Sequence, residues 1–341
     1  MKIFILNATK SGTDTIRFIS KELELSGVIG LSDRTGKGIA GFCYNKDFTN
    51  SLNIPFYEVQ SYSLSYPQDI DLLKALPIDL LIVTGWQRLI PEWLITHCKI
   101  GVIGLHGSPF GITKGRGRSP QNWAIILGET EFNLSIFFID EGIDSGKIID
   151  SKTFKISLFD DIKTSYKKSC LAFAELLLKN IKNEKIKNKD QLEIQNGEAE
   201  YFPQRKPEDG LIDWNRSEFE IFNFIKALTR PYPGAATLIE GKYLIIWEAI
   251  PFEYDFPDKN IYIAGEIVRV FSDESFIVKC YNGFLLALDY EFRKESTQIK
   301  KGKLLESANF HNQINRIMER HYKKYPNLQI SRAISELEDD K

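Results

Sequence analysis

Short apolar runs alternate with stretches of helical periodicity through the first half of the chain. Five runs predict buried strands: KIFIL, SGVIGLS, IDLLIVT (Ile78–Thr84), Val102–Leu105 and LSIFFI (Leu134–Ile139). Apolar residues recur at helical spacing in the segments 13–25, 67–77, 91–97, 119–127 and, as one long amphipathic helix, 159–182. Strands that alternate with helices form a parallel sheet covered on both faces, so residues 1–182 predict an α/β domain.

The second half of the chain follows a different pattern. Residues 183–200 are polar and lack strong periodicity, which is typical of a linker. Ser217-Glu218-Phe219-Glu220 is a capping box that opens a helix, and this helix must end near Pro231. Its apolar face carries Ile221, Phe224, Ile225 and Leu228. Strand-like runs then continue to about residue 290, so residues 201–305 predict a small antiparallel β-barrel.

The last segment, residues 306–341, predicts a helical tail at the surface. Its apolar side carries Phe310, Ile314, Ile317 and Tyr325. No internal repeat is visible in the sequence.

Composition narrows the class of protein. The 341 residues are 43% hydrophobic and 26% charged, with a formal net charge of −2, which is typical of a globular protein and argues against a general binder of nucleic acid or membrane surfaces. Four widely spaced cysteines suggest neither a zinc site nor a disulfide framework, and we expect a cytoplasmic location. The apolar run in MKIFILNATK is too short for a signal peptide, and no run of about 18 apolar residues predicts a membrane span.

Residues Gly36–Gly41 match the GxGxxG dinucleotide fingerprint, but their context is wrong. The fingerprint follows the first strand and opens a helix, whereas this copy follows the second strand and precedes FCYNKDFTN, which does not continue as a helix. We therefore interpret it as a glycine-rich loop rather than a nicotinamide site.

His106 and Asp144 are the candidate chemical centre. His106 follows the strand 102–105, and Asp144 follows the strand that ends at Ile139, so the two strand ends are expected to bring them together. A carboxylate beside an imidazole fixes its tautomer and stabilises the imidazolium. Between them, the loop Gly115-Arg116-Gly117-Arg118 combines cationic side chains with close backbone approach, which suits an anionic ligand.

These motifs resemble the formyltransferases that use 10-formyltetrahydrofolate, including methionyl-tRNA and nucleotide-sugar N-formyltransferases. The family pattern is roughly Asn-x-His-x-Ser, an Arg-Gly loop, Pro-x-x-Trp-Ala and a later Asp-x-Gly. Here it reads His106-Gly107-Ser108, Arg116-Gly117, Pro120-Gln121-Asn122-Trp123-Ala124 and Asp144-Ser145-Gly146. Upstream, GWQRLI (85–90) is similar to the family's pterin-binding segment, and downstream PQRKPEDGLIDW and RPYPGA are similar to the start of its C-terminal domain.

The resemblance covers residues 1–305 and implies a Rossmann-like domain followed by a small, OB-like barrel. It also implies roles for residues. His106 relays protons and Asp144 orients it, while Ser108 holds the substrate or the loop. The predicted contacts to the folate co-substrate are Trp86, Gln87, Arg88, Leu89, Ile90, Arg118, Asp140, Glu141, Gly142 and Ile143. No metal is expected.

Two positions depart from the family pattern. The family's Asn two residues before the His, which helps to hold the formyl oxygen, is Gly104, and a second polar position is Phe137. The loop between His106 and Arg116 is also two residues longer than usual. Loss of one oxyanion donor costs about 10²–10³ in rate, so another group is expected to substitute, with Asn122, Gln121 and Ser108 as candidates.

The acceptor is predicted from charge. Residues 203–305 hold 14 Lys/Arg and 16 Asp/Glu, a balance that disfavours tRNA, because tRNA binding needs neutralised phosphates. A nucleotide-linked amino sugar is therefore the expected acceptor, used in surface-glycan (lipopolysaccharide) biosynthesis. Methionyl-tRNA formylation and, motivated by Gly104, a degenerate folate- or nucleotide-binding protein stay open, as does the oligomeric state, with a homodimer as one option.

Overall fold

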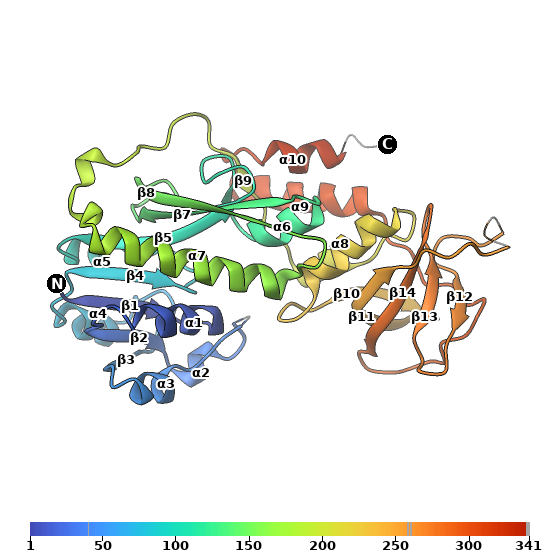
Figure 1. Ribbon diagram of the computed structural model, residues 1–341, viewed down its shortest axis with the longest axis horizontal. Helices are drawn as coiled ribbons and strands as arrows, with labels where there is room; N and C mark the ends of the chain where they lie inside the picture. Colours follow the sequence, from blue (N-terminus) through green and yellow to red (C-terminus); the bar gives the residue numbers. More distant parts are fainter. Residues whose placement is uncertain (40, 258, 260, 339–341) are drawn as a thin grey trace. The chain divides into compact units, whose positions relative to one another are not determined.

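The chain forms two compact units in the computed structural model, which describes residues 1–39, 41–257, 259 and 261–338 (Figure 1). The first unit contains Met1–Gly117, Glu131–Lys155 and Tyr166–Ala199. The second contains Arg118–Thr130, Ile156–Ser165 and the chain from Glu200 onward. These boundaries differ from the expected single cut near residue 182, because two internal segments are counted with the C-terminal half.

The first unit is built on a seven-stranded sheet of order β3-β2-β1-β4-β5-β7-β8. Its strands are β1 (Ile3–Asn7), β2 (Gly27–Leu31), β3 (Phe56–Val59), β4 (Leu80–Thr84), β5 (Gly101–Ser108), β7 (Glu131–Phe138) and β8 (Ile148–Lys155), with a short β6 (Arg116–Gly117) outside the sheet. Its helices are α1 (Lys10–Ile19), α2 (Asp33–Gly36), α3 (Lys46–Ser51), α4 (Pro67–Lys74), α5 (Glu92–His97) and α7 (Ile162–Lys182), whose first four residues are counted with the second unit.

The sheet is mixed rather than parallel throughout. Strands β1 to β5 pair in parallel, which confirms the prediction for β1, β2, β4 and β5, whereas β3 and β8 were not predicted. β7 is antiparallel to β5, and β8 is antiparallel to β7. The expectation that LSIFFI continues the parallel set is therefore wrong. A parallel neighbour needs a crossover whose helix packs on the sheet, but the helix between β5 and β7, Pro120–Ile126, is counted with the second unit.

Both faces of the sheet are buried. On one face, Leu73 of α4 and Leu94 of α5 pack with Leu6, Leu81 and Val102. On the other, α1 and α7 lie side by side in front of the sheet (Figure 1), and the Cys170 thiol of α7 lies 3.2 Å from the Ser11 carbonyl oxygen of α1. Both helices bury apolar residues completely: Ile16, Ile19, Phe173 and Leu177. This two-sided burial explains why the strands form continuous apolar runs.

The polar segment after α7 is docked on the first unit. It contains two short 3₁₀ turns, η1 (Lys185–Lys187) and η2 (Lys189–Gln191), and buries Ile186 and Leu192. The amide of Ile148 in β8 donates to the Glu193 carbonyl oxygen at 2.9 Å. Residues 183–200 were expected to form a linker. Instead, Glu193 of this segment adds one antiparallel bridge to Ile148 of the edge strand β8.

The second unit contains a small antiparallel barrel. Its five strands are ordered β10-β11-β14-β13-β12. Their bounds are β10 (Ala235–Ile239), β11 (Lys242–Pro251), β12 (Ile267–Val270), β13 (Phe276–Lys279) and β14 (Phe284–Phe292). Residues 304–306 form bridges to both sides, Leu238↔Glu306 and Glu266↔Leu304, which connect β10 to the chain entering β12. This closure removes the two exposed sheet edges.

The second unit also contains helices and short elements outside the barrel. They are α6 (Pro120–Ile126), β9 (Tyr201–Phe202), η3 (Pro207–Gly210), α8 (Glu218–Leu228), α9 (Phe310–Lys324), α10 (Arg332–Ser335) and η4 (Glu336–Glu338). The predicted capping box is confirmed, because Ser217 and Glu220 cap each other at the start of α8. Helix α9 buries Phe310, Ile314 and Ile317, as its apolar side predicts, while Tyr325 is half-buried.

Helix α6 is counted with the second unit because Trp123 packs there. The ring is fully buried, and its Nε1 donates to the Pro203 carbonyl oxygen at 2.9 Å. The Arg205 guanidinium lies 4.9 Å from the Trp123 ring and 5.3 Å from the Phe224 ring. Burial lowers the pKa of Arg205 to about 10, opposed by the charge of Asp209, so the stacked group is still a cation at neutral pH.

The predicted fold class is confirmed: a Rossmann-like α/β domain, a small antiparallel barrel and a C-terminal helix. Within the described residues, every helix is too short or too polar to cross a bilayer.

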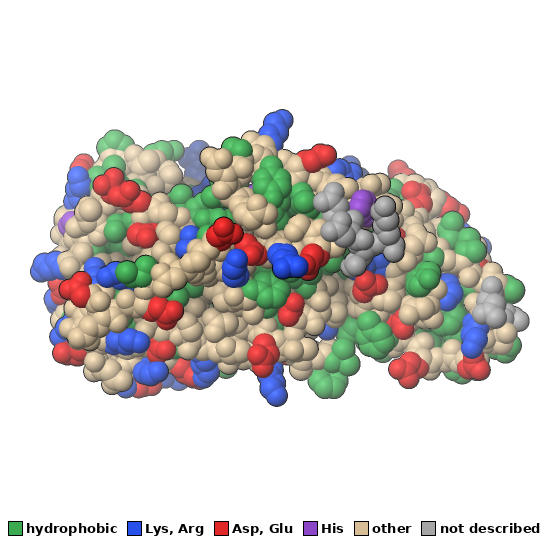
Figure 2. All heavy atoms as spheres, turned by 90° about the horizontal axis from the view of Figure 1, so that it is seen from above, with side chains coloured by type: hydrophobic (Ala, Val, Ile, Leu, Met, Phe, Trp, Pro, Cys, Tyr) green, Lys and Arg blue, Asp and Glu red, His purple; other side chains and the backbone are tan. Residues whose placement is uncertain are grey.

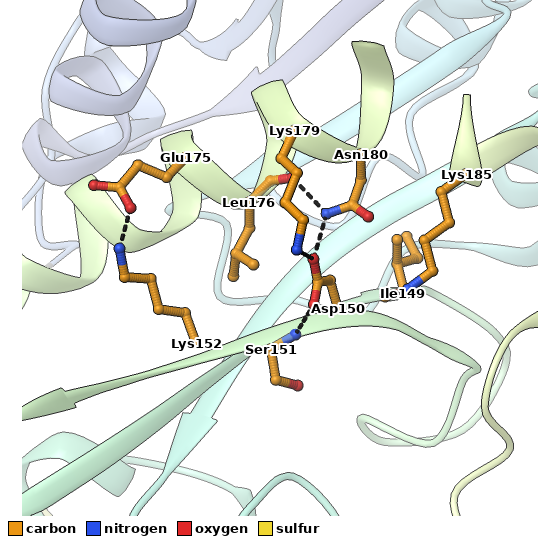
Figure 3. Close-up of polar contacts among 9 residues, drawn as sticks. All are labelled: Ile149, Asp150, Ser151, Lys152, Glu175, Leu176, Lys179, Asn180 and Lys185. Carbon is orange, nitrogen blue, oxygen red and sulfur yellow. Dashed lines mark hydrogen bonds and ion pairs between the residues drawn. The ribbon is translucent and has the colours of Figure 1, made fainter. Parts of the chain in front are cut away.

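Asp150 of β8 fastens helix α7 to the sheet (Figure 3). Its carboxylate accepts hydrogen bonds from Lys179 Nζ at 2.8 Å, Asn180 Nδ2 at 2.9 Å and the Ser151 amide at 2.9 Å. Burial raises the pKa of Asp150, but these three donors outweigh it, and the net pKa lies below its ordinary value. Asp150 therefore stabilises the fold above the pKa of an unfolded Asp and loses that contribution as the pH falls.

We predict that Asp150→Asn lowers the free energy of unfolding by about 1.5–3 kcal/mol at neutral pH, the usual range for hydrogen bonds to a charged group. The difference from wild type should shrink as the pH falls from neutral towards about 3, because the unfolded wild type then takes up a proton at this residue. Urea unfolding at both pH values measures this. Glu175→Gln is the matched control, since Glu175 of α7 makes an exposed ion pair with Lys152 of β8 (Figure 3). Equal losses in the two variants would contradict the prediction.

Candidate functional site

His106 lies inside strand β5, not beyond its end as expected. β4 pairs only with residues 101–103 of β5, whereas β7 pairs with β5 as far as Ser108. From Gly104 onward the strand therefore has a hydrogen-bonded neighbour on the β7 side only. Alternation along the strand places Gly104, His106 and Ser108 on the same face.

The His106 ring lies between two oxygen acceptors. Nε2 is 2.6 Å from the Gly115 carbonyl oxygen, and Nδ1 is 3.3 Å from Asp144 Oδ2. The residue is buried, with 9% of its surface exposed. A carbonyl and a carboxylate can only accept, so only the doubly protonated ring donates to both. The Gly115 carbonyl oxygen thus occupies Nε2, which must exchange this acceptor before it can serve a substrate.

Asp144 reaches His106 by a route that differs from the predicted one. The register pairs Ile103 with Phe138, so the carboxyl end of β7 lies beside the beginning of β5 rather than beside His106. The expected meeting of two parallel strand ends is therefore wrong, because β7 is antiparallel. The loop 139–147 instead brings Asp144 to the ring, with Asp144 in the left-handed region at φ 50°. The amide of Gly117 donates to Asp144 Oδ2 at 3.1 Å and fixes the carboxylate.

One residue that contacts these loops was missed by the sequence reasoning. Gln195 accepts from Arg116 Nη2 at 2.7 Å and donates to the Asp144 carbonyl oxygen at 2.8 Å. Nothing in the polar, aperiodic segment 183–200 distinguishes this glutamine from its neighbours. Its role becomes visible only in the structure, where Glu193, two residues earlier, bridges to Ile148 at the edge of the sheet.

Ser108 and the two amide candidates are all engaged within their own units. Ser108 is fully buried, and its hydroxyl accepts from the Phe110 amide at 3.0 Å, which fits the role of holding the loop. Asn122 Nδ2 donates to the Ala227 carbonyl oxygen at 2.6 Å, and Gln121 Nε2 donates to Ser165 Oγ at 3.0 Å. Both amide side chains are buried in the second unit. That either replaces the family's oxyanion donor stays a prediction.

The space beside Gly104 is filled by apolar side chains. A Cβ built on Gly104 would lie 2.9 Å from Ile139 Cδ1 and 3.5 Å from the Phe137 ring. Phe137 is 4% exposed. An Asn side chain therefore fits at this position only if Ile139 moves. The two departures from the family pattern, Gly104 and Phe137, are thus neighbours in the structure.

The predicted pterin segment follows β4 through a tight turn. Gly85 has φ +64°, and a Cβ there would lie 1.9 Å from Thr9 Oγ1, so only glycine fits. Trp86 packs edge-on against Tyr62, and the Gln87 amide donates to the Tyr62 hydroxyl at 2.8 Å. The Arg88 guanidinium lies 5.5 Å from the Tyr62 ring, Ile90 is buried and Leu89 is 65% exposed. Within the described residues, Trp86 Nε1 is buried without a hydrogen-bond partner.

The other predicted donor contacts lie on two loops. Asp140 Oδ1 accepts from the Gly142 amide at 3.1 Å and from Ser145 Oγ at 2.6 Å, which shapes the turn before Asp144. Glu141 is exposed and Ile143 is half-buried in the same turn. Arg118 is also exposed, in the second unit. These contacts stay predictions. Throughout the described part of the chain, no group of three His, Cys, Asp or Glu side chains is arranged to hold a metal ion.

The GxGxxG match does not have the structure of a dinucleotide loop. Helix α2 ends at Gly36, so the glycines follow a helical turn instead of opening one. The expectation that FCYNKDFTN is not helical is wrong in part, because α3 begins at Lys46, five residues after Gly41. Ala40 of the match lies outside the described residues.

Comparison with known proteins places this site in a family. Residues 26–180 match the family described as formyl transferase, and residues 205–312 match the formyl transferase C-terminal domain. The chain is 30% identical over 294 residues to a methionyl-tRNA formyltransferase from Fusobacterium nucleatum, covering 84% of this chain and 90% of that protein. It is 35% identical over 243 residues to the bifunctional polymyxin resistance protein ArnA from Wigglesworthia glossinidia brevipalpis, covering 67% of this chain and 37% of that protein.

Among solved structures, the chain is similar to the N-formyltransferase from Helicobacter canadensis in complex with folinic acid and dTDP-3-aminofucose. The TM-score is 0.57 at 20% identity, with 84% of this chain and 98% of that chain covered. This likeness shows a shared fold. Together with the two matched domains and the relatives, it leads to one conclusion: the chain belongs to the formyl transferase family.

Proposed function

We propose that the protein is an N-formyltransferase that moves a formyl group from 10-formyltetrahydrofolate to the amine of a nucleotide-linked amino sugar. The observation that carries the proposal is the His106 ring between Asp144 Oδ2 and the Gly115 carbonyl oxygen, inside the formyl transferase domain. A buried imidazole with an orienting carboxylate is the arrangement that proton transfer at a reacting nitrogen needs.

The reaction needs a proton carrier and a stabiliser of negative charge. The unprotonated amine attacks the formyl carbon, which forms a C–N bond and a tetrahedral oxyanion. Collapse of this species breaks the bond to the folate nitrogen, which takes up a proton as the attacking nitrogen loses one. His106 Nε2 passes that proton, and in its charged form it stabilises the oxyanion. Asp144 Oδ2 holds Nδ1 and keeps the ring in place.

The backbone at residues 86–90 and the loop 140–144 are the proposed donor site. The positive φ of Gly85 turns the chain at the end of β4, which is where an open α/β sheet binds its ligands. The exposed side chain of Leu89 offers an apolar contact to a pterin ring. The Helicobacter relative, which binds folinic acid, supports a folate co-substrate.

Charge supports the amino-sugar acceptor. Residues 203–305 carry 14 Lys/Arg and 16 Asp/Glu, and acidic and basic side chains are interspersed on the face shown in Figure 2. A sugar diphosphate needs a few local cations, whereas a tRNA needs an extended basic surface. The Helicobacter relative, solved with dTDP-3-aminofucose, supports the same reading. Use in lipopolysaccharide assembly in the cytoplasm is part of this proposal, and the four free cysteines fit a reducing compartment.

Methionyl-tRNA formylation is the second candidate. The observation that favours it is sequence similarity, because the Fusobacterium relative covers 84% of this chain. The acceptor is therefore the part of the proposal that experiment must decide.

We predict that His106→Gln and Asp144→Asn each lower kcat by about 10²–10⁴-fold, the usual contribution of a general acid–base group. Both changes nearly preserve side-chain volume, so the thermal midpoint of unfolding should stay close to wild type. Initial rates of formyl transfer with saturating folate donor give the measurement. His311→Gln, at the start of α9, is the matched control and should retain full activity. More than about a tenth of the wild-type rate in either site variant would rule out the proton-relay role.

We also predict that a panel of nucleotide-linked 3-amino and 4-amino sugars contains one that is formylated, while aminoacylated initiator tRNA stays at background. The reason is the near-neutral segment 203–305, which lacks the excess of cations that counterion release on tRNA binding needs. Mass spectrometry detects the added formyl group on the sugar, and acid gel electrophoresis detects it on the tRNA. Efficient formylation of the tRNA with no sugar product would reverse the assignment of the acceptor.

Restoring the family Asn should depend on Ile139. We expect Gly104→Asn alone to lower the thermal midpoint, since its Cβ would lie 2.9 Å from Ile139 Cδ1, and Gly104→Asn/Ile139→Ala to recover part of the loss. If the amide then donates to the oxyanion, kcat of the double variant should exceed that of Ile139→Ala by up to about 10²-fold. A single variant as stable as wild type would show that Ile139 does not compete for this space.

A further inference from the structure

Gln195 makes five hydrogen bonds to the two loops that flank His106. Its Oε1 accepts from Thr113 Oγ1 at 3.2 Å and from Arg116 at 3.2 Å (Nε) and 2.7 Å (Nη2). Its Nε2 donates to the carbonyl oxygens of Asp144 at 2.8 Å and Gly146 at 2.9 Å. One half-buried side chain thus uses both ends of its amide, one end on each loop.

Each of these loops supplies one acceptor to the His106 ring. Thr113 and Arg116 flank Gly115, whose carbonyl oxygen faces Nε2 at 2.6 Å. Asp144 supplies the carboxylate that faces Nδ1 at 3.3 Å. Gln195 therefore contacts neither ring nitrogen, but it holds both of the groups that do.

The backbone around Gln195 is fixed to the sheet. The Ile148 amide donates to the Glu193 carbonyl oxygen at 2.9 Å, and Lys147 Nζ donates to that of Lys189 at 3.1 Å. Leu192 is buried with 5% of its surface exposed. Because the backbone is hydrogen-bonded to β8 at Glu193, two residues before Gln195, the side-chain amide of Gln195 has a defined position near the edge of the sheet.

Only a carboxamide can make this set of bonds. The side chain must accept on one atom and donate twice on the other, which glutamine does and neither glutamate nor methionine can. The bond to the Asp144 carbonyl also holds the backbone of a residue at φ 50°, a conformation that costs most non-glycine residues about 1 kcal/mol or more.

We propose that Gln195 is the positioning residue of this site, setting the geometry of the His106–Asp144 pair by clamping the loops 113–117 and 144–146 together. The kinetic part of this inference depends on the proposed formyl transfer. The structural part, that Gln195 fixes the surroundings of the His106 ring, does not. Active groups held by such supporting hydrogen bonds lose efficiency when the support is removed, even though no substrate contact is lost.

Two variants and a control test the kinetic part. Gln195→Met loses all five bonds at similar length, and Gln195→Glu keeps the acceptor side towards Arg116 but sets an oxygen against two carbonyls. We expect kcat to fall about 10-fold to 100-fold in both, with KM for donor and acceptor close to wild type. Gln191→Met, an exposed glutamine in the same segment, should be unchanged. If Gln195→Met fails to fold, Gln195→Glu carries the same comparison.

An NMR experiment tests the structural part of the inference without any substrate. The chain has only four histidines, His97, His106, His311 and His321, so the imidazole signals can be assigned in a ¹H–¹³C NMR spectrum with His106→Gln. We expect the His106 signal to shift or broaden in both Gln195 variants, while the other three and the Gln191→Met spectrum stay in place. A His106 signal unmoved in both variants overturns the proposal, as does an unchanged kcat in an active enzyme. If the wild type formylates no acceptor, the proposed function fails, and the NMR result alone decides the role of Gln195.

Discussion

The His106 ring is held between two oxygen atoms that can only accept hydrogen bonds, and these atoms come from different loops. With 9% of the residue exposed, water cannot easily replace either partner. The ring satisfies both oxygens only when both of its nitrogens carry protons. A proton that leaves Nε2 must therefore be matched by a movement of the Gly115 carbonyl or by a substrate group that takes its place. This constraint couples the protonation of the ring to the geometry of two loops.

The close approach of these loops explains the residues found in them. A Cβ on Gly115 would lie 1.8 Å from Ser108 Oγ, and one on Gly146 would lie 1.7 Å from the Phe138 carbonyl oxygen. Gly117, at φ +98°, presents its amide to Asp144. The glycines and the left-handed Asp144 thus provide space and unusual backbone angles at the points where the two loops meet. Their presence reflects packing around one carboxylate, and Gln195 completes that packing from outside.

The change of strand direction at β5 creates the room for this arrangement. β4 leaves β5 after Ile103, and β7 continues along the other side as an antiparallel neighbour. On this side, a short length of β5 has no strand bonded to it, although its residues are buried. There the chain can place a histidine on a rigid element while its partners come from loops. Ile139 and Phe137 fill the space beside Gly104 with apolar atoms.

Local patterns in the sequence determined much of the fold. Apolar runs of strand length, the helical periods and the Ser217–Glu220 capping box depend on near neighbours, and the structure confirms them. The proximity of His106 and Asp144 was also predicted from the sequence, because their motifs are short and ordered. Tertiary structure alone decided the antiparallel β7, the docking of residues 183–193 on β8 and the packing of Trp123 beside Arg205. These features depend on pairing and burial between residues far apart in the chain. The segment that carries Gln195 is polar and aperiodic, so its sequence alone does not predict which residues it contacts.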